Sequence, residues 1–142
     1  MSVSDTGTLL IIDDDRSFGA VLVAHAVKKG FKPTYCTSLL DLGSFARIRE
    51  FDIAIVDYYL GSLRGDEIAE YVDTFFREIP VVIVSAESFK SEQIAKWPQS
   101  VRRFVSKSVG PQAIVDATAK VLARERFLRS LEKRSGVVYT TP

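Results

Sequence analysis

The stretch that decides the fold is DIAIVDYYLG, residues 52–61, in which the apolar run Ile53 to Val56 ends at the carboxylate of Asp57. A continuous apolar run, in place of an alternating one, predicts a strand buried on both faces, as in a parallel sheet. In an open α/β sheet, ligands bind just beyond the carboxyl ends of the central strands. Asp57 is therefore the first candidate for a functional residue.

Four more stretches are typical of strands, and most of them also end in polar side chains. They are Leu9 to Ile12 before Asp13-Asp14-Asp15, Lys32 to Cys36, Val81 to Val84 before Ser85-Ala86, and Val101 to Val105 before Ser106-Lys107. The first and third are solidly apolar and suit the centre of a sheet, together with Ile53 to Val56. The other two carry polar residues and suit its edges.

Helical patterns follow each of these strands. We expect helices from Arg16 to a stop at Gly30, from Ser38 to about Arg49, from Ile68 to near Arg77, from Glu92 to Trp97, and from Pro111 onward. Five strand–helix units without a repeat or linker predict an α/β fold. We expect a doubly wound, five-stranded parallel sheet in the order 2-1-3-4-5, with helices on both faces, as in flavodoxin-like proteins.

Composition limits the classes of protein to consider. The 142 residues suit one domain, and 19 Lys and Arg against 18 Asp and Glu give no electrostatic reason to expect nucleic acid or an anionic membrane. Cys36 is the only cysteine, which excludes an internal disulfide and fits a reducing compartment. No apolar run approaches the ~20 residues of a membrane span, and Met1 to Thr8 does not resemble a signal peptide. We expect a cytoplasmic protein with a flexible N-terminus (residues 1–8), one domain (9–124), and a C-terminal helix extension and tail (125–142).

The predicted strand ends bring together Asp13, Asp14, Asp57, Ser85 and Lys107. Three adjacent carboxylates repel one another unless a cation lies among them, and Mg²⁺ prefers oxygen ligands. Lys107 can pair with a carboxylate or a phosphoryl oxygen, and the Ser85 hydroxyl can donate a hydrogen bond to another such oxygen. The set predicts a magnesium-dependent site for a phosphoryl group.

From Leu9 to Leu122 the chain resembles the receiver domain of two-component response regulators. The Asp13-Asp14 pair matches that family's metal-binding acids, Asp57 its phosphoacceptor, Ser85-Ala86 its hydroxyl and small residue, and Lys107 its lysine. Phe104 matches the family's switch aromatic, three residues before the lysine.

The resemblance implies a chemistry. Asp57 would take a phosphoryl group from a sensor histidine kinase, a phosphotransfer protein or a small phosphodonor. Mg²⁺ would be held by Asp14, Asp57 and the Tyr59 carbonyl, with Asp13 acting through water. Phe104 would turn inward as Ser85 moves toward the phosphoryl group. The protein would be a switch for a protein-interaction surface and not an enzyme, beyond slow self-dephosphorylation.

Four further residues near the site modify this expectation. Ser108 stands where the family usually has a proline after a cis peptide bond, and Gly61 stands where a proline is common in the loop after Asp57, so we expect loops that differ in shape. Tyr59 and Glu87 lie two residues beyond Asp57 and Ser85, where the family varies the access of water. Tyr59 would shield the acyl phosphate, or Glu87 would orient a water molecule.

Two other functions stay open. Asp13 to Ser17 loosely resembles the signature of haloacid-dehalogenase-like phosphatases, although those enzymes place their hydroxyl and lysine motifs before a final acid pair. A receiver-like interaction module that is never phosphorylated is the other alternative, because Ser108 departs from the family pattern. Sustained turnover would indicate the phosphatase, and one stoichiometric phosphorylation would indicate the receiver.

The residues after Leu122 are too few for a DNA-binding fold or an enzyme, so we expect a stand-alone receiver whose output passes through a protein partner. The final helix continues beyond what the sheet requires, with Phe127, Leu128 and Leu131 before Ser135-Gly136. Ile114, Val121 and Leu128 lie at heptad spacing. We expect these last apolar side chains to form a homodimer or partner surface, the alternative being that the helix bends back and buries Phe127. His25, the only histidine, is expected to be a packed or edge residue and not a ligand.

Overall fold

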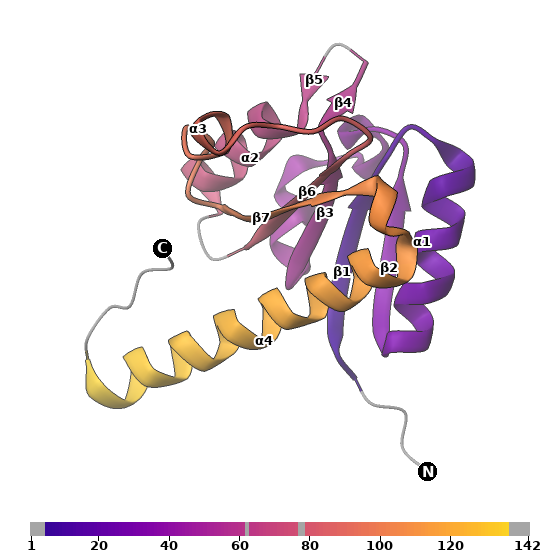
Figure 1. Cartoon of the computed structure of the whole chain (residues 1–142). Coiled ribbons are helices and arrows are strands. Elements are labelled where there is room, and N and C mark those ends of the chain that lie inside the picture. Colours follow the sequence, from indigo (N-terminus) through magenta and orange to yellow (C-terminus); the bar gives the residue numbers. More distant parts are fainter. Residues whose placement is uncertain (1–4, 62, 77–78, 137–142) are drawn as a thin grey trace.

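A parallel sheet of five strands in the order β2-β1-β3-β6-β7 forms the centre of the molecule (Figure 1). The computed structural model describes residues 5–61, 63–76 and 79–136. The strands are β1 (Gly7–Ile12), β2 (Phe31–Cys36), β3 (Ile53–Asp57), β6 (Val81–Ser85) and β7 (Val101–Ser106). The predicted order 2-1-3-4-5 is confirmed, with the three apolar strands in the centre and the two more polar strands at the edges.

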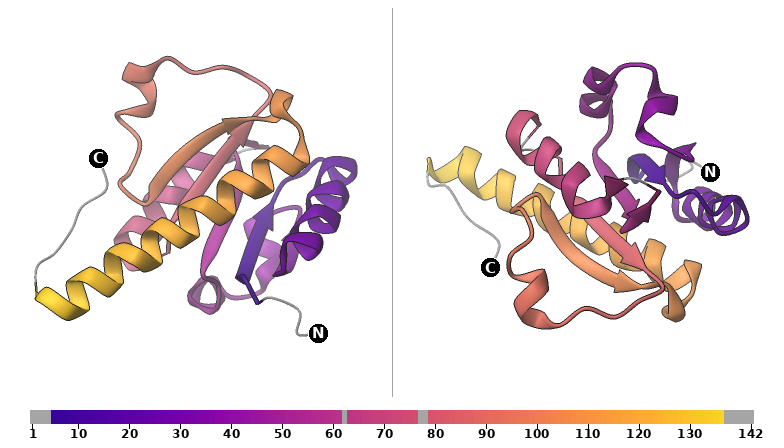
Figure 2. Two further views of the ribbon diagram at one scale, coloured as in Figure 1. Left: turned by 60° about the horizontal axis from the view of Figure 1, so that its bottom comes forward. Right: turned by 90° about the horizontal axis from the view of Figure 1, so that it is seen from above.

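Helices cover both faces of the sheet, as predicted (Figure 2). They are α1 (Arg16–Lys29), α2 (Gly65–Phe75), α3 (Ser91–Ile94) and α4 (Pro111–Ser135). Side chains of α1 and α4, such as Leu22 and Ile114, pack against Ile11 and Ile55 on one face. On the other face, side chains of α2 pack in a second core with Leu10, Ile12, Val56 and Ile83. None of the described helices is long and apolar enough to span a bilayer.

Local capping fixes where α1 begins and ends. The Asp15 carboxylate accepts a hydrogen bond from the Phe18 amide at the start of the helix. Gly30 ends it with a φ of 99°, a left-handed conformation that glycine adopts without steric cost. Because α1 starts directly after the carboxyl end of β1, Asp13 and Asp14 lie in the short connection between the two.

Two predicted helices are wrong in kind or length. The segment from Ser38 to Arg49 forms two short 3₁₀ helices, η1 (Leu39–Leu42) and η2 (Phe45–Glu50), because Gly43 takes a left-handed φ of 80° between them. The Asp41 carboxylate accepts hydrogen bonds from the amide and hydroxyl of Thr37. The helix expected from Glu92 to Trp97 is only α3, four residues long.

Other boundaries differ by smaller amounts. β1 begins at Gly7, two residues before the predicted start, and α2 ends at Phe75, while Arg77 lies outside the described residues. The loop after Asp57 contains a small antiparallel pair that the sequence analysis missed, β4 (Tyr59–Leu60) and β5 (Leu63–Arg64).

The final helix is continuous through Ser135 and ends at Gly136, as predicted. It does not bend back, and Phe127 is 61% exposed. The heptad interpretation of Ile114 and Val121 is wrong, because both side chains are buried in the core that α4 shares with the sheet. Figure 1 and the left view of Figure 2 show the end of α4 projecting past the sheet.

Candidate functional site

The predicted site residues meet at the carboxyl edge of the sheet. Asp57 and Ser85 are the last residues of β3 and β6, Asp13 directly follows β1, and Lys107 directly follows β7. The four strands are neighbours in the sheet, with Asp57 opposite Val84 and Ser85 opposite Ser106. Parallel register therefore places side chains from four distant parts of the sequence in one cradle.

The ammonium group of Lys107 joins the two buried carboxylates. Its Nζ lies 2.8 Å from Asp13 Oδ2 and 3.2 Å from Asp57 Oδ2, and it donates a hydrogen bond to the latter. The Asp13 and Asp57 side chains are 0% and 9% exposed. Burying two like charges side by side is costly, so one cation shared between them stabilises the arrangement.

The acidic cluster brings together oxygen atoms that could hold a cation. Carboxylate oxygens of Asp13, Asp14 and Asp57 lie within 4.8 Å of one another, and Asp14 is exposed. Asp13 Oδ1 accepts a hydrogen bond from the Asp15 amide, whereas the buried Oδ2 accepts none from the described residues despite its ion pair with Lys107. The Lys107 ammonium is therefore the partner of this buried oxygen in the described residues. Hard oxygen donors of this kind suit Mg²⁺, so the residues present fit that ion.

Burial also perturbs the acidity of the site. Burial and the neighbouring Asp13 carboxylate raise the pKa of Asp57 to about 6, and the Lys107 ammonium opposes them. Burial lowers the pKa of Lys107, but its contacts with Asp13 and Asp57 outweigh this and leave the pKa raised. Near neutral pH Asp57 is thus an ionised carboxylate held beside a permanent cation, in water-poor surroundings.

Ser85 is fully buried next to this cradle. Its hydroxyl oxygen accepts a hydrogen bond from the Glu87 amide at 3.1 Å. Ser85 directly follows Val84, the register partner of Asp57, so both residues lie at the same edge of the sheet, and the Ser85 hydroxyl retains a proton that it can donate.

Four aromatic side chains pack beside the site and are called the aromatic cluster here: Tyr58, Phe89, Trp97 and Phe104. The ring centroids of Phe104 lie 5.4 Å from Phe89 and 6.0 Å from Trp97, and Tyr58 lies 5.5 Å from Trp97. Phe104, which is expected to turn inward on phosphorylation, thus already packs against Phe89 and Trp97 within this cluster. Phe89 and Trp97 were not among the predicted site residues, although a lone tryptophan in a polar stretch indicates a local apolar contact.

Comparison with known proteins agrees with this geometry. The family model described as "Response regulator receiver domain" matches residues 9–119. The chain belongs to the response regulator receiver family.

Curated relatives and solved structures extend the comparison. The chain is 27% identical over 133 residues to the regulatory protein VirG of Rhizobium rhizogenes, a match that covers 89% of this chain and 53% of VirG. It is 25% identical over 117 residues to the heme response regulator HssR of Staphylococcus saprophyticus, covering 82% of this chain and 52% of HssR. The receiver therefore spans about half the length of these relatives.

A CheY-like response regulator receiver structure from Methanospirillum hungatei superimposes with a TM-score of 0.71 at 17% identity, covering 84% of this chain and 95% of that one. At this identity the likeness shows the shared fold.

This receiver differs from the usual pattern in the loop after Lys107. Lys107–Val109 form a 3₁₀ turn, η3, in which the Ser106 hydroxyl accepts a hydrogen bond from the Ser108 amide. None of the peptide bonds in the described residues is cis. A hydroxyl cap thus fixes the turn where the family usually has a proline, and Lys107 still reaches both carboxylates.

Two further contacts shape the rim of the receiver site. Tyr59 is 48% exposed, and its hydroxyl donates a hydrogen bond to Glu87 at 3.1 Å, which links the loops after β3 and β6. Gly65 packs against the backbone of the Asp57 loop, since a Cβ there would lie 2.7 Å from the Asp57 carbonyl oxygen. The proposed role of the Tyr59 carbonyl as a metal ligand stays a prediction.

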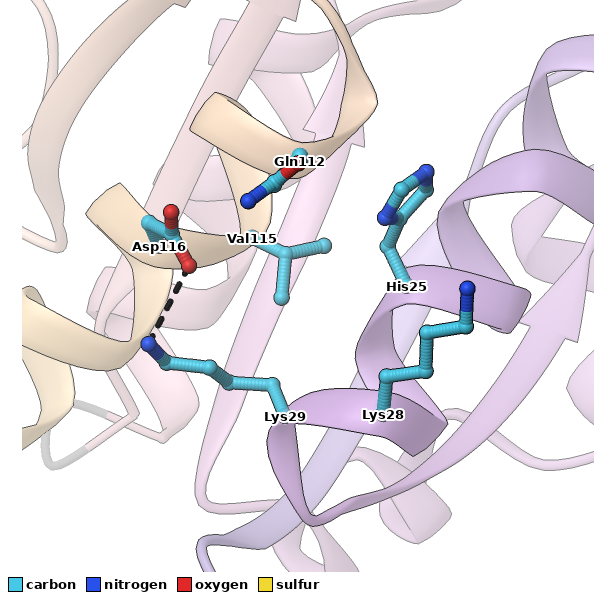
Figure 3. A pocket seen from close by; sticks show the side chains of 6 residues that line it. All are labelled: His25, Lys28, Lys29, Gln112, Val115 and Asp116. Atoms are coloured by element: carbon cyan, nitrogen blue, oxygen red, sulfur yellow. Dashed lines mark ion pairs between the residues drawn. The ribbon is translucent and has the colours of Figure 1, made fainter.

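A separate pocket of about 400 Å³ lies between α1 and α4 (Figure 3). It contains none of the strand-end residues. Lys29 and Asp116 form an ion pair of 3.1 Å across it, and His25 is half-buried at its edge, in agreement with the expected edge histidine. The remaining lining residues are Lys28, Gln112 and Val115.

Proposed function

We propose that this receiver accepts a phosphoryl group on Asp57 in a two-component phosphorelay. The observation that carries the proposal is the shared contact of the Lys107 ammonium with the buried carboxylates of Asp13 and Asp57, beside the exposed Asp14. Such a cradle has a nucleophile, a cation for the phosphoryl oxygens and a coordination position for Mg²⁺.

The transfer step is a displacement at phosphorus. An ionised Asp57 oxygen forms the new P–O bond while the bond to the donor's leaving group breaks, and in a phosphohistidine donor the electron pair returns to the imidazole nitrogen. Lys107 stabilises the charge on the transferred group. Mg²⁺ would be held by Asp13, Asp14, Asp57 and the Tyr59 carbonyl. When bound, this ion would neutralise part of the negative charge on the phosphoryl group.

The acyl phosphate then biases a local rearrangement. A phosphoryl oxygen on Asp57 is a stronger acceptor for the Ser85 hydroxyl than any neutral group near it. Moving Ser85 loosens its contact with the Glu87 amide and changes the loop that carries Phe89. The aromatic cluster, and Phe104 within it, is the element through which the change reaches the surface.

The partners follow from this chemistry. The phosphodonor is a sensor histidine kinase or a phosphotransfer protein, and the output is a downstream protein that senses the altered face. We infer no contact with nucleic acid or membrane, since the charge balance of +1 gives no reason for either. The projecting end of α4 is a candidate surface for homodimerisation.

Intact mass spectrometry tests the proposal. Incubation with Mg²⁺ and acetyl phosphate should add one phosphoryl group to the wild type, none to Asp57→Asn, and one to the control Asp15→Asn, which keeps the cap of α1. A magnesium chelator should prevent the gain, and Asp14→Ala should raise the Mg²⁺ concentration required.

Other outcomes identify the alternatives. Continued release of phosphate without accumulation would favour a phosphatase of the haloacid-dehalogenase type. A wild type that gains no mass from acetyl phosphate or from a panel of phosphorylated histidine kinases would favour an interaction module that is never phosphorylated.

A further inference from the structure

The outer face of α4 has a composition unlike that of an ordinary solvated helix. The helix is anchored to the body through Glu125, whose carboxylate accepts a 2.6 Å hydrogen bond from Arg102 of β7, and through Arg126, which contacts Thr6 and Asp52. Nine further residues extend to Ser135, about 13 Å at 1.5 Å per residue. This part projects past the sheet in Figures 1 and 2.

One face of this projecting helix is both basic and apolar. Residues spaced by three and four share a helix face, and the face roughly opposite the buried Val121 and Leu122 is called the arm face here. It comprises Lys120, Arg124, Phe127, Leu131 and Arg134. Phe127 is 61% exposed and the three cations are exposed. No acid stands among these five positions; Glu125 and Glu132 are adjacent to them in sequence, and Glu125 is already paired with Arg102.

Helix α2 carries the opposite charge beside an exposed aromatic pair. It contains Asp66, Glu67, Glu70 and Asp73 and no lysine or arginine, although Arg64 at its N-cap pairs with Asp66 and Glu67. The Phe75 side chain is 62% exposed, and its ring centroid lies 4.8 Å from that of Tyr71. The α2 face, defined as Glu67, Glu70, Tyr71, Thr74 and Phe75, is therefore acidic and aromatic.

The two faces cannot be one intramolecular contact, because α2 and α4 cover opposite faces of the sheet. They are complementary in charge and both present an exposed aromatic side chain. Aromatic anchors with flanking opposite charges are typical of specific protein interfaces. The partner that offers an acidic, aromatic helix with this pattern is a second copy of the same chain.

We propose that the arm face of one copy docks on the α2 face of a second copy, reciprocally, to form a two-fold dimer. Phe127 packs against Tyr71 and Phe75 of the other copy, while Arg124 and Lys120 lie near Glu70 and Glu67. The reciprocal arrangement closes the assembly, whereas a single contact repeated head to tail would form an open filament. This inference rests on the homodimer surface proposed above for the end of α4 and specifies the face that it meets, and it does not depend on phosphorylation of Asp57.

Charge reversal with exchange tests this contact on the full chain. An arm-reversed variant, Lys120→Glu with Arg124→Glu, and an α2-reversed variant, Glu70→Lys with Thr74→Lys, alter only exposed side chains. Sedimentation velocity should show a dimer for the wild type and a monomer for each variant alone. A mixture of the two variants should dimerise again, because both contacts of the mixed pair regain opposite charges. Arg103→Glu, an exposed change on β7, should leave the dimer unchanged.

Three outcomes would contradict the proposed dimer. A wild type that stays monomeric at concentrations up to about 100 μM, variants that still dimerise, or a mixture that stays monomeric would each overturn the proposal. Raising the salt concentration from 50 to 500 mM should weaken the dimer by about tenfold, since the contact is partly electrostatic. Circular dichroism and thermal melts of each variant separate loss of docking from loss of folding.

Discussion

Replacing Asp57 with asparagine should make the stability of the metal-free protein less dependent on pH. The folded state binds a proton on Asp57 up to a pKa of about 6, whereas the unfolded chain releases it near 3.8. Between these values the native state holds more protons than the unfolded state, so the free energy of unfolding falls as the pH rises. The protonated Asp57 carboxyl makes its full contribution to the free energy of unfolding below pH 3.8, and this contribution is lost above about pH 6.

The magnitude follows from the pKa shift. A shift from 3.8 to about 6 corresponds to at most about 3 kcal/mol, at about 1.4 kcal/mol per pKa unit. The free energy of unfolding of Asp57→Asn, relative to that of the wild type, should therefore rise by up to about 3 kcal/mol between pH 4 and pH 7, since the amide carries no charge beside Asp13. For a protein of this size that is a difference of roughly 10 °C in Tm.

Urea unfolding of both proteins from pH 4 to pH 8, in the presence of a chelator, measures the effect. Asp14→Asn is the matched control, because Asp14 belongs to the same cluster but is exposed and pays no cost of burial. A stability difference that does not change with pH, or a wild type that gains stability relative to Asp57→Asn as the pH rises, would refute the reasoning. Added Mg²⁺ should narrow the difference at pH 7, since a bound cation relieves the same repulsion.

Three further predictions concern single contacts. Arg102→Ala should lower the free energy of unfolding by about 3 kcal/mol, because it leaves Glu125 buried and unpaired, and Arg102→Met with Glu125→Leu should recover most of the loss in urea unfolding. Gly65→Ala should lower the free energy of unfolding by about 1–3 kcal/mol and slow acceptance of the phosphoryl group, since its Cβ would press on the Asp57 carbonyl. An unchanged rate of phosphorylation by intact mass would contradict this. Tyr59→Ala should shorten the lifetime of the acyl phosphate several-fold while Tyr59→Phe should not, and equal lifetimes in all three proteins would remove the shielding role.

The strands and the site could be predicted because each rests on short stretches of sequence. A strand buried on both faces needs a continuous apolar run, as in Ile53 to Val56, and the parallel order then places every carboxyl end on one edge. Asp13, Asp57, Ser85 and Lys107 are near one another for that reason alone. Their placement required no knowledge of loop structure.

The missed features depend on contacts between distant segments. The apolar residues Leu39, Leu42 and Ile48 are all buried, but Gly43 separates the two short 3₁₀ helices that carry them. The Arg102–Glu125 pair follows from a register shift that leaves Arg102 as an extra residue in β7, between the partners of Val81 and Val82. No periodicity in the sequence indicates such a shift.

The aromatic cluster gives this receiver a built-in optical probe. The chain contains one tryptophan, and the Trp97 ring lies 5.5 Å from Tyr58, which follows Asp57 directly, and 6.0 Å from Phe104. The indole emission therefore comes from a single known place, in contact with the residue next to the proposed acceptor and with the proposed switch. We expect intrinsic fluorescence to report the proposed binding of a cation, arrival of a phosphoryl group and its hydrolysis in real time, without a label or a change to the chain.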